Sequence, residues 1–494
     1  MTQHRDDHHD ARPASPRTPV AHGDPDGEGG SEPVLFNDQY GTPWARVPHG
    51  DRLENLQLRG RAFRNWLIRG MLDAGERPTR GRIAERLDEF EAYADQDRRA
   101  LHNRSAWHEE GRSPCIDLAD ERWRTVVVGE SGWEVAADPG VLFRRFAHQI
   151  PLPDPDPSGD LRDLLPFLPP LRCEADRILV LTYLVAALVP MPRPILMPVG
   201  PQGSAKSTLC SLVRRLVDPS RAELLGRDAR ADLVQTFYRH AVPVFDNASD
   251  FTPVEADLCC QAVTGRAIDR RRLYTDGEEY LLSFFRAIVV NGIRPPTNRP
   301  DLLDRSLIIE LERLTHDRRR YPGRLEAEFR EASPRLFGGL LNAPSRTLSL
   351  LPSVPEDGLS RMADFHRFGR AAALAPGFTV EAFDAAMREA ESRRRRNATD
   401  SPPVAALLPF ARKQGRWAGD PTTLLERLAD TARAHQVRRT PESWPDTPIG
   451  LGRQLTRLAV ILAEHGVALA RPRKARERLV SLEYDPAADL SLEG

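Results

Sequence analysis

The sequence predicts an α/β protein whose central domain, about residues 160–345, is a parallel sheet carrying a phosphate-binding loop (P-loop). Short β-like runs alternate with helical stretches across this region, as in parallel α/β domains. A glycine-containing loop at residues 200–208 stands between an apolar run and a helical pattern. The loop holds Lys206, one of three lysines in a chain of 494 residues that otherwise uses arginine. The broad, planar guanidinium group of arginine cannot replace a compact ammonium group inside a loop that surrounds phosphates. This explains why a lysine is retained at this position.

Composition limits the classes of protein and partner. Hydrophobic residues make up 40% of the chain and charged residues 29%, as in soluble proteins. The formal net charge of -1 gives no overall attraction to nucleic acid or anionic membrane, so any such binding must come from local patches. The five cysteines show no CxxC spacing, which argues against a disulfide framework or a zinc site and favours a reducing cytoplasm.

No segment is expected to enter a membrane. The first residues are polar and contain no apolar run, so we expect no signal peptide. The longest apolar stretch, Ile178 to Val189, is too short to cross a bilayer and predicts a buried helix. We therefore expect a cytoplasmic protein with no membrane partner.

The region before the central domain is expected to contain a tail and a small domain. Residues 1–45 are rich in His, Asp, Pro and Gly and predict a disordered tail. Its histidines His4, His8 and His9 could hold a metal, but nothing fixes a coordination geometry, and a solvated tail is favoured.

Residues 50–150 predict a small α+β domain with two helices followed by short strands. The helical patterns run through Phe63-Trp66-Leu67 and Ile83-Leu87-Phe90-Tyr93, and the strands are expected at residues 115–118, 125–128 and 132–135. The proline-rich residues 151–157 are predicted to form a linker.

After the central domain we expect a helical lid or continuation over residues 346–396 and a second linker over residues 397–403. Residues 404–494 predict a further domain. Its helices are expected at residues 424–434 and 450–465, followed by a pair of strands ending at residue 482.

The loop has the residue types and the strand–loop–helix context of a P-loop. Its backbone N–H groups and the following helix N-terminus are suited to surround phosphates. Lys206 is expected to reach the β and γ phosphates, and the Ser207 hydroxyl is expected to bind Mg²⁺. Ala205 departs from the usual pattern because it occupies a glycine position. The sequence thus predicts ATP and Mg²⁺ binding through Gly200, Pro201, Gln202, Gly203, Ser204, Ala205, Lys206, Ser207 and Thr208.

A second apolar run, residues 242–245, ends in Asp246 and Asn247 about forty residues after the loop. This is where a parallel strand would deliver a Walker B aspartate to Mg²⁺, so Asp246 is a predicted metal ligand. Many hydrolases place a glutamate where Asn247 stands. An asparagine can orient water but cannot accept its proton, so the rate of hydrolysis stays open.

Two further candidates follow the next apolar runs. Asn291 ends the run at residues 287–290 and could hold the attacking water between the Walker residues and the γ-phosphate. Its alternative role is to start a turn before Gly292. An arginine of the segment Asn298 to Ser306, which precedes the expected strand at residues 307–311, could project into the nucleotide site of a neighbouring subunit.

An Asp-Gly pair at residues 276–277, between two β-compatible runs, predicts a β-hairpin. Its first arm and tip carry residues that suit a DNA backbone and a stacked base: Arg270, Arg271, Arg272 and Tyr274. A solvated hairpin with cross-strand Arg–Glu pairs is the alternative.

The order of these pieces resembles the superfamily-3 helicase branch of the AAA+ ATPases, and most closely the primase-helicase ATPases of phages and integrative elements. The resemblance covers roughly residues 55–490 and is densest from 195 to 370. It is carried by residues 200–208, Phe245-Asp246-Asn247, Arg272-Leu273-Tyr274-Thr275-Asp276, Val290-Asn291-Gly292-Ile293, Arg299-Pro300-Asp301-Leu302 with Asp304-Arg305, and Arg361-Met362-Ala363-Asp364-Phe365. The polymerase-type primase module of that family is not visible.

The resemblance implies a homo-oligomeric ring, a hexamer, with ATP between subunits and the hairpin reaching single-stranded DNA in a central channel. It implies that Asp246 is the Walker B carboxylate, Asn291 the sensor and Arg305 the arginine finger. Arg361 is a candidate second sensor.

The last ninety residues resemble the winged-helix domains appended to such ATPases, and this implies duplex DNA binding. The candidate contacts are Arg453 and Arg457 on the recognition helix and Arg473 and Lys474 on the wing. A helical interaction domain with solvated arginines is the alternative.

Two functions are compatible with these features. The first is an ATP-driven ring that translocates on DNA, a replicative helicase of a phage, plasmid or integrative element. The second is an ATP-regulated DNA-binding or signalling and defence NTPase that oligomerises without unwinding DNA.

Overall fold

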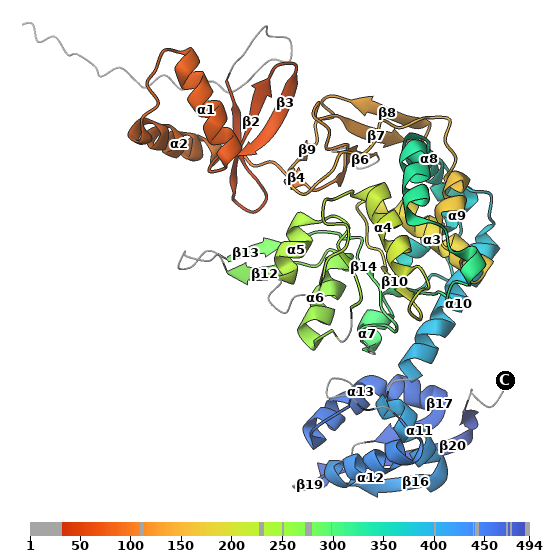
Figure 1. Cartoon of the computed structure of the whole chain (residues 1–494). Helices are drawn as coiled ribbons and strands as arrows, with labels where there is room; N and C mark the ends of the chain where they lie inside the picture. Colours follow the sequence, from red (N-terminus) through yellow and green to blue (C-terminus); the bar gives the residue numbers. More distant parts are fainter. Residues whose placement is uncertain are drawn as a thin grey trace, which may run out of the picture.

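The computed structural model (Figure 1) describes residues 32–108, 113–226, 232–248, 251–271, 279–297, 299–399, 402–437, 439, 444–470, 473–474 and 477–489. A central α/β region lies between an N-terminal region and a C-terminal region, and helix α10 leads from the core to the C-terminal region.

The N-terminal region begins with an antiparallel sheet of three strands, with two helices packed against it. The strands are β1 (Val34–Asn37), β2 (Pro43–His49) and β3 (Arg52–Gln57), and the helices are α1 (Arg61–Asp73) and α2 (Arg80–Ala94). Both predicted helices are therefore confirmed. The prediction of a disordered tail up to residue 45 is wrong from Val34 onward. Phe36 and Trp44 are buried with Leu101 and Leu142, and this apolar contact holds the first two strands in place. Residues 1–31, with His4, His8 and His9, lie outside the described residues.

A second small sheet follows in the order β5-β6-β7-β8. Its strands are β5 (Ser105–Trp107), β6 (Pro114–Asp117), β7 (Thr125–Gly129) and β8 (Gly132–Ala136), and β4 (Leu101–His102) pairs with β9 (Leu142–Phe143) beside it. The three strands predicted for this region are confirmed. Residues 151–157 form no helix or strand, and a 3₁₀ helix, η1 (Leu161–Phe167), follows them.

The core is a parallel sheet of four strands in the order β11-β14-β10-β15. The strands are β10 (Ile195–Val199), β11 (Val244–Phe245), β14 (Val289–Val290) and β15 (Ser306–Glu310). Each was predicted from an apolar run. Because the strands are parallel, their carboxyl ends meet at one edge of the sheet and their amino ends at the other.

Helices cover both faces of this sheet. Alternate side chains of β10 explain why: Leu196 packs in one buried cluster with α3 and α4, while Ile195 and Met197 pack in another with α5, α6 and α7. The helices are α3 (Glu174–Ala187), α4 (Lys206–Val217), α5 (Leu233–Arg239), α6 (Pro253–Thr264) and α7 (Pro300–Leu303). Helix α3 is the predicted buried apolar helix. In the described part of the chain, no helix has the length and apolar character needed to span a bilayer.

A β-hairpin extends from the core, as predicted. Strands β12 (Ile268–Arg271) and β13 (Glu279–Leu282) pair antiparallel and point away from the sheet (Figure 1). Residues 272–278, including Arg272 and Tyr274, lie outside the described residues, as do the side chains of Arg270 and Arg271.

The remaining helices pack on α3 and continue toward the C-terminus. After η2 (His316–Arg318) come α8 (Pro322–Leu350), η3 (Leu351–Ser353), α9 (Ala363–Leu374) and α10 (Val380–Thr399), then α11 (Pro402–Gln414). The predicted linker at 397–403 is wrong for most of its residues. Residues 397–399 extend α10, and Pro402 begins α11 because proline fits the first turn of a helix, where no backbone donor is needed.

The C-terminal region contains the two predicted helices and the predicted strand pair. After β16 (Arg416–Gly419) come α12 (Pro421–Ala434) and α13 (Pro448–Glu464), and then β17 (His465–Ala470), β18 (Arg473–Lys474), β19 (Glu477–Arg478) and β20 (Val480–Asp489). Strand β20 lies between β16 and β17 in an antiparallel sheet.

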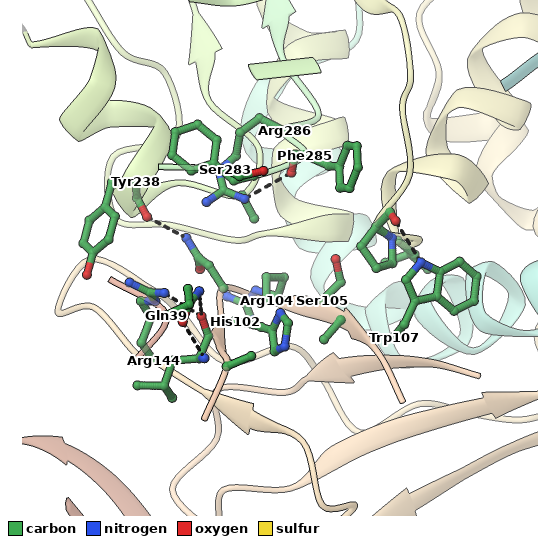
Figure 2. Close-up of a pocket in the computed structure, with 18 of the residues that line it drawn as sticks. Gln39, His102, Arg104, Ser105, Trp107, Arg144, Tyr238, Ser283, Phe285 and Arg286 are labelled. Carbon is green, nitrogen blue, oxygen red and sulfur yellow. Dashed lines mark hydrogen bonds between the residues drawn. The ribbon is translucent and has the colours of Figure 1, made fainter. Parts of the chain in front are cut away.

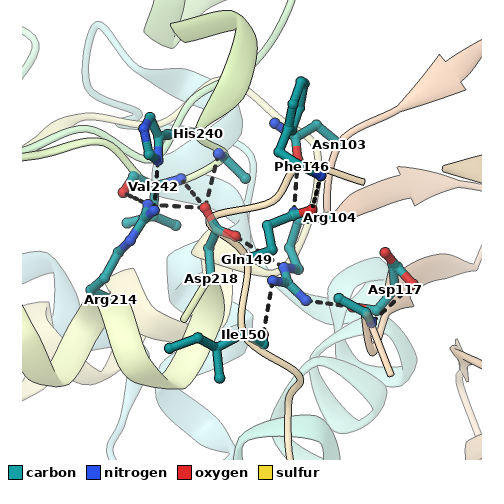
Figure 3. Close-up of polar contacts among 12 residues, drawn as sticks. Asn103, Arg104, Asp117, Phe146, Gln149, Ile150, Arg214, Asp218, His240 and Val242 are labelled. Atoms are coloured by element: carbon teal, nitrogen blue, oxygen red, sulfur yellow. Dashed lines mark hydrogen bonds and ion pairs between the residues drawn. The ribbon is translucent and has the colours of Figure 1, made fainter. Parts of the chain in front are cut away.

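The N-terminal region meets the core at the amino ends of the parallel strands. A cavity of about 360 Å³ lies at this junction (Figure 2). Beside it, Arg104 of the N-terminal region reaches the core carboxylate of Asp218 (Figure 3).

Asp218 holds three parts of the molecule together. Its Oδ1 lies 3.0 Å from Arg104 Nε, and its Oδ2 lies 2.9 Å from Nη1 of Arg214 on α4. Oδ2 also accepts the backbone N–H groups of Ala241 and Val242, which lead into β11, at 3.0 and 3.1 Å. Burial alone would raise the pKa of Asp218, but the charges of Arg214 and Arg104 outweigh it and hold this pKa well below its usual range. The carboxylate is therefore charged at neutral pH.

Two histidines complete this network. His240 Nδ1 lies 2.7 Å from Arg214 Nη2, and the rings of His240 and His148 lie 4.1 Å apart. Burial lowers the pKa of His240 to about 3, and the charges of Arg214 and His148 act in the same direction. A neutral His240 can accept the guanidinium hydrogen at Nδ1, whereas a protonated one cannot.

We predict that Asp218→Asn destabilises the protein by about 3–5 kcal/mol, because two buried guanidinium groups lose their counter-charge. Urea unfolding at pH 7.5 measures the effect. The control is Asp154→Asn, which removes a carboxylate that is 73% exposed from its pair with Arg124. That change is expected to cost no more than about 1 kcal/mol. Equal effects of the two substitutions would contradict the importance of the Asp218 network.

We predict a loss of stability on acidification that depends on His240. In the unfolded chain a histidine takes up a proton as the pH falls through about 6.5, whereas His240 in the folded protein stays neutral until about pH 3. Acidification through this window therefore shifts the equilibrium toward the unfolded state. His240 alone lowers the free energy of unfolding by about 2 kcal/mol between pH 7 and pH 5. His240→Asn, whose carbonyl can still accept from Arg214, should flatten the pH dependence, whereas His435→Gln on the surface should not. If stability depends on pH equally steeply in wild type and His240→Asn, His240 is not the source of the acid sensitivity.

Candidate nucleotide-binding site

The loop between β10 and α4 adopts a backbone that depends on its small residues. Gly200 and Gly203 have φ of 152° and 78°. A Cβ at Gly200 would lie 2.1 Å from the carbonyl oxygen of Leu311, so no larger residue fits there. Ala205, at the helix N-cap, takes the left-handed conformation with φ of 62°. Alanine thus occupies a glycine-type position at a cost of about 1–2 kcal/mol.

Lys206 directs its ammonium group into the loop. Nζ donates to the carbonyl oxygens of Gly200 and Pro201 at 2.9 and 2.7 Å and lies 3.3 Å from Ser204 Oγ. Partial burial lowers the pKa of Lys206. The loop therefore curls around a cation, the arrangement required to hold an anionic group over the helix N-terminus.

The predicted magnesium ligands lie next to each other. Ser207 Oγ donates to Asp246 Oδ1 at 2.8 Å, although 39 residues separate them in the sequence. Ser207 lies in the first turn of α4, after the loop that follows β10, and Asp246 directly follows β11, so the parallel sheet delivers both to its carboxyl edge. A hydroxyl and a carboxylate are hard oxygen donors of the kind that Mg²⁺ accepts together with phosphates and water.

Asn291 lies between them at the end of β14, the strand between β10 and β11. Its Nδ2 donates to Asp246 Oδ1 at 2.6 Å and to Cys210 Sγ at 3.2 Å, and its Oδ1 accepts the backbone N–H of Asn247 at 2.9 Å. These contacts fix the amide of this buried side chain. Asn291 therefore orients the Asp246 carboxylate. The alternative, a turn before Gly292, is not formed, because Gly292 pairs with Val199 instead. Asn247 is exposed and has a left-handed backbone with φ of 51°.

Arg305 lies at the opposite edge of the sheet. Its carbonyl oxygen accepts the N–H of Ile195, the first residue of β10, whereas the loop follows Val199 at the far end of that strand. A strand of five residues spans about 16 Å. The structure therefore does not bring Arg305 to the loop of its own chain. Arg361 lies with Arg305, since it pairs with Asp304 at 2.7 Å and with Asp301 at 3.7 Å.

The remaining predicted residues lie in the C-terminal region. Arg453 is exposed on α13. Arg457 is on the same helix, and Arg473 and Lys474 form β18, but the side chains of these three residues lie outside the described part of the structure.

The sequence did not reveal a second cavity, of about 320 Å³, that adjoins the loop at Ser207 and Thr208. It extends along α4 to Arg215 and is closed by Phe167 of η1 and Phe329 of α8. The two phenylalanine rings meet edge to face, 5.7 Å apart. The walls come from three distant segments without a shared motif, so no local sequence signal could have identified them. Arg319 was also missed; its Nη2 lies beside Gly203 of the loop.

Two family models match the chain. Residues 164–391 match the model of the actinomycete integrative conjugative element (AICE) replication protein, and residues 404–490 match the AICE RepA C-terminal domain. Both models describe parts of RepA, and together they span more than half of the chain. Over these residues, the chain is similar to the AICE RepA replication proteins. No curated protein matches the chain.

The solved structures that are similar to this chain are distant. The C-terminal region of NrS-1 is 12% identical, with 92% of this chain and 97% of that chain covered and a TM-score of 0.40. The JCV helicase is 12% identical, with 48% and 64% covered and a TM-score of 0.23. A chain of the Drosophila ORC bound to DNA is 14% identical, with 70% and 94% covered and a TM-score of 0.16. All three TM-scores are below 0.5, so no conclusion rests on them.

We predict that Asn291→Asp destabilises the protein by about 1–3 kcal/mol at pH 7.5, because two carboxylates then share one site and the donor to Asp246 is lost. The like charge raises the pKa of the new carboxyl in the folded protein, so the penalty should shrink as the pH falls toward 5 and the group is protonated. Asn291→Ala removes the same amide without adding a charge and should show no such recovery. Thermal unfolding relative to wild type at each pH measures both. Parallel pH profiles of the two variants would show that Asn291 does not face the Asp246 carboxylate.

Proposed function

We propose that this protein is an ATP hydrolase that assembles into a ring and moves along DNA, as a replicative helicase of an integrative element. The single observation that supports this most strongly is the contact of Ser207, Asp246 and Asn291 beside a loop closed around Lys206. These residues follow three strands of the sheet and converge where a nucleoside triphosphate with Mg²⁺ would bind. The family match supports a role in DNA replication.

Each residue has a role in the proposed hydrolysis. Lys206 neutralises the β and γ phosphates, and Ser207 and Asp246 hold Mg²⁺, which supplies positive charge to the transferring phosphoryl group. Asn291 keeps the Asp246 carboxylate oriented. Asn247 orients water but cannot accept its proton. The cavity between Phe167 and Phe329 has the position and the apolar walls to receive the nucleoside base.

The ring is proposed from the position of Arg305. Because it lies at the edge away from its own loop, it can complete a nucleotide site only in a neighbouring subunit. Arg361 stabilises the segment before Arg305 through its ion pairs with Asp304 and Asp301, rather than acting at the loop of its own chain. We propose a homo-hexamer with ATP between subunits, in the cytoplasm.

DNA contacts are proposed at two places. The hairpin β12–β13, with Arg270, Arg271, Arg272 and Tyr274, would grip single-stranded DNA in the ring channel. The C-terminal region, with Arg453, Arg457, Arg473 and Lys474, would hold duplex DNA as a winged-helix-like domain. The order of its elements, with two helices followed by paired strands, is compatible with that proposal.

A second function is favoured by one observation. Asn247 occupies the place of the usual catalytic glutamate. If hydrolysis is slow for this reason, ATP would act as a switch for oligomerisation and DNA binding without unwinding.

We predict that Arg305→Ala leaves nucleotide binding intact and lowers the ATPase rate by roughly a thousandfold or more, as expected for an arginine finger. Mixing it with Lys206→Ala subunits should restore part of the activity, because some interfaces then combine an intact loop with an intact Arg305. The control is Arg313→Ala, which removes an exposed arginine beyond β15. If no mixing ratio restores activity, the nucleotide site is not shared between subunits.

A further inference from the structure

The cavity at the junction of the N-terminal region and the core is separate from the P-loop. Its walls come from segments far apart in the sequence, including residues 100–107 and Arg144 on one side and Arg193 and residues 283–286 on the other (Figure 2). Arg193 precedes β10 and Arg286 precedes β14, so the cavity lies at the amino edge of the sheet. The P-loop lies at the carboxyl edge.

The cavity has an excess of positive charge. Four arginines line it, and no aspartate or glutamate is among the described residues that do so. Arg104 shares the single negative charge of Asp218 with Arg214, as described above. The carboxylate nearest to Arg144 is Asp38, at 3.8 Å. In the part of the chain that the structure describes, neither Arg193 nor Arg286 forms an ion pair.

These cations are buried. Arg144, Arg193 and Arg286 are only 3%, 2% and 8% exposed. Their hydrogen bonds go mainly to backbone carbonyls: Arg193 donates to Val189, and Arg286 donates to Phe237 and Phe285. A carbonyl carries no charge, so it does not neutralise a guanidinium group in a poorly solvated place.

Some of their donors have no acceptor. Among the described residues, the buried Nε of Arg193 and the buried Nε and Nη1 of Arg144 form no hydrogen bond. An unsatisfied buried donor is costly, and more so on a charged group. Burial lowers the pKa of Arg193 to about 10 and that of Arg286 to about 9, which reflects the same missing anion.

We propose that this cavity binds a small phosphate monoester. The charges of Arg144, Arg193 and Arg286, less that of Asp38, leave an excess of about two, which matches the dianion of a phosphate monoester. Guanidinium groups pair with phosphate oxygens through two parallel hydrogen bonds. A volume of about 360 Å³ is at the small end of ligand pockets and admits a phosphate with one planar group.

Aromatic side chains provide the surface for that planar group. Tyr238, Trp107 and Phe285 line the cavity (Figure 2). Trp107 is held in place because its Nε1 donates to the carbonyl of Pro190 at 2.9 Å. Burial, with the charges of Arg144 and Arg286, lowers the pKa of His102 to about 4, so His102 is neutral here and adds no further charge.

The ligand would connect the N-terminal region with the hairpin. Ser283 and Arg286 directly follow β13 of the hairpin, and Tyr40 donates its hydroxyl to the carbonyl of Ser283 at 3.0 Å. A phosphate held by Arg144 and Arg286 bridges the same two parts. This site does not depend on the proposed ATPase activity.

The test is thermal unfolding of the full-length Lys206→Ala protein, in which the P-loop lacks its phosphate-binding lysine. The probes are inorganic phosphate and adenosine 5′-monophosphate, at pH 7.5 and constant ionic strength. Chloride and adenosine are the matched controls without a phosphate. Both phosphate probes should raise the unfolding temperature by at least about 2 °C, and the controls should not. No shift with either phosphate probe would overturn the proposal.

Arg193→Gln and Arg286→Gln, each in the same background, locate the site. Both should abolish the phosphate-dependent shift. Neither substitution should lower the unfolding temperature of the ligand-free protein. Each removes a buried positive charge that has no counter-charge, and the glutamine amide still donates hydrogen bonds. Arg177→Gln, on the exposed face of α3, should retain the full shift. If the shift persists in Arg193→Gln and Arg286→Gln, or if both variants fail to fold, the arginines are structural and the proposal is wrong. Protection by a single-stranded oligonucleotide, but by neither phosphate probe, would assign the cavity to DNA and overturn the small-ligand proposal.

Discussion

Asp218 is the C-terminal cap residue of α4, the helix that follows the loop at residues 200–208. Its buried carboxylate pairs with the guanidinium groups of Arg104 and Arg214 (Figure 3). It also caps the backbone that enters β11. Helix α4 begins at the loop and β11 ends at Asp246, so one buried charge fixes both elements that deliver Ser207 and Asp246. Because Arg104 belongs to the N-terminal region, the same contact docks that region on the core.

This arrangement gives the two edges of the parallel sheet different chemistry. At the carboxyl edge, strand ends and a helix N-terminus bring together an ammonium, a hydroxyl, a carboxylate and an amide. These are the functional groups expected in a nucleotide-binding site. At the amino edge, three buried arginines lack sufficient counter-charge, and Arg305 faces away from its own loop. In the functions proposed above, the first edge binds ATP, whereas the second holds an anion and supplies a cation to a neighbouring subunit. The hairpin begins and ends near the second edge, so the cavity at that edge is positioned to influence it.

The sequence predicted the carboxyl edge well because Asp246, Asn291 and the loop that carries Ser207 each directly follow an apolar run. Once those runs are strands of one parallel sheet, Ser207, Asp246 and Asn291 must meet, whatever their separation in the chain. The errors have local causes. A short strand at Val34 and a helix starting at Pro402 were hidden by residues that are also common in tails and linkers. The amino edge could not be predicted, since Arg144, Arg193 and Arg286 look like the other arginines until tertiary packing removes them from water.

The most direct test of the account is the steady-state ATPase rate of the full-length protein with Mg²⁺, measured with and without single-stranded DNA in wild type and in Lys206→Ala. The account predicts hydrolysis that single-stranded DNA accelerates in wild type, and no hydrolysis under either condition in a folded Lys206→Ala protein. An equal rate in wild type and folded Lys206→Ala would contradict the nucleotide site. Hydrolysis that depends on Lys206 but does not respond to DNA would contradict the DNA motor and favour the ATP-regulated switch.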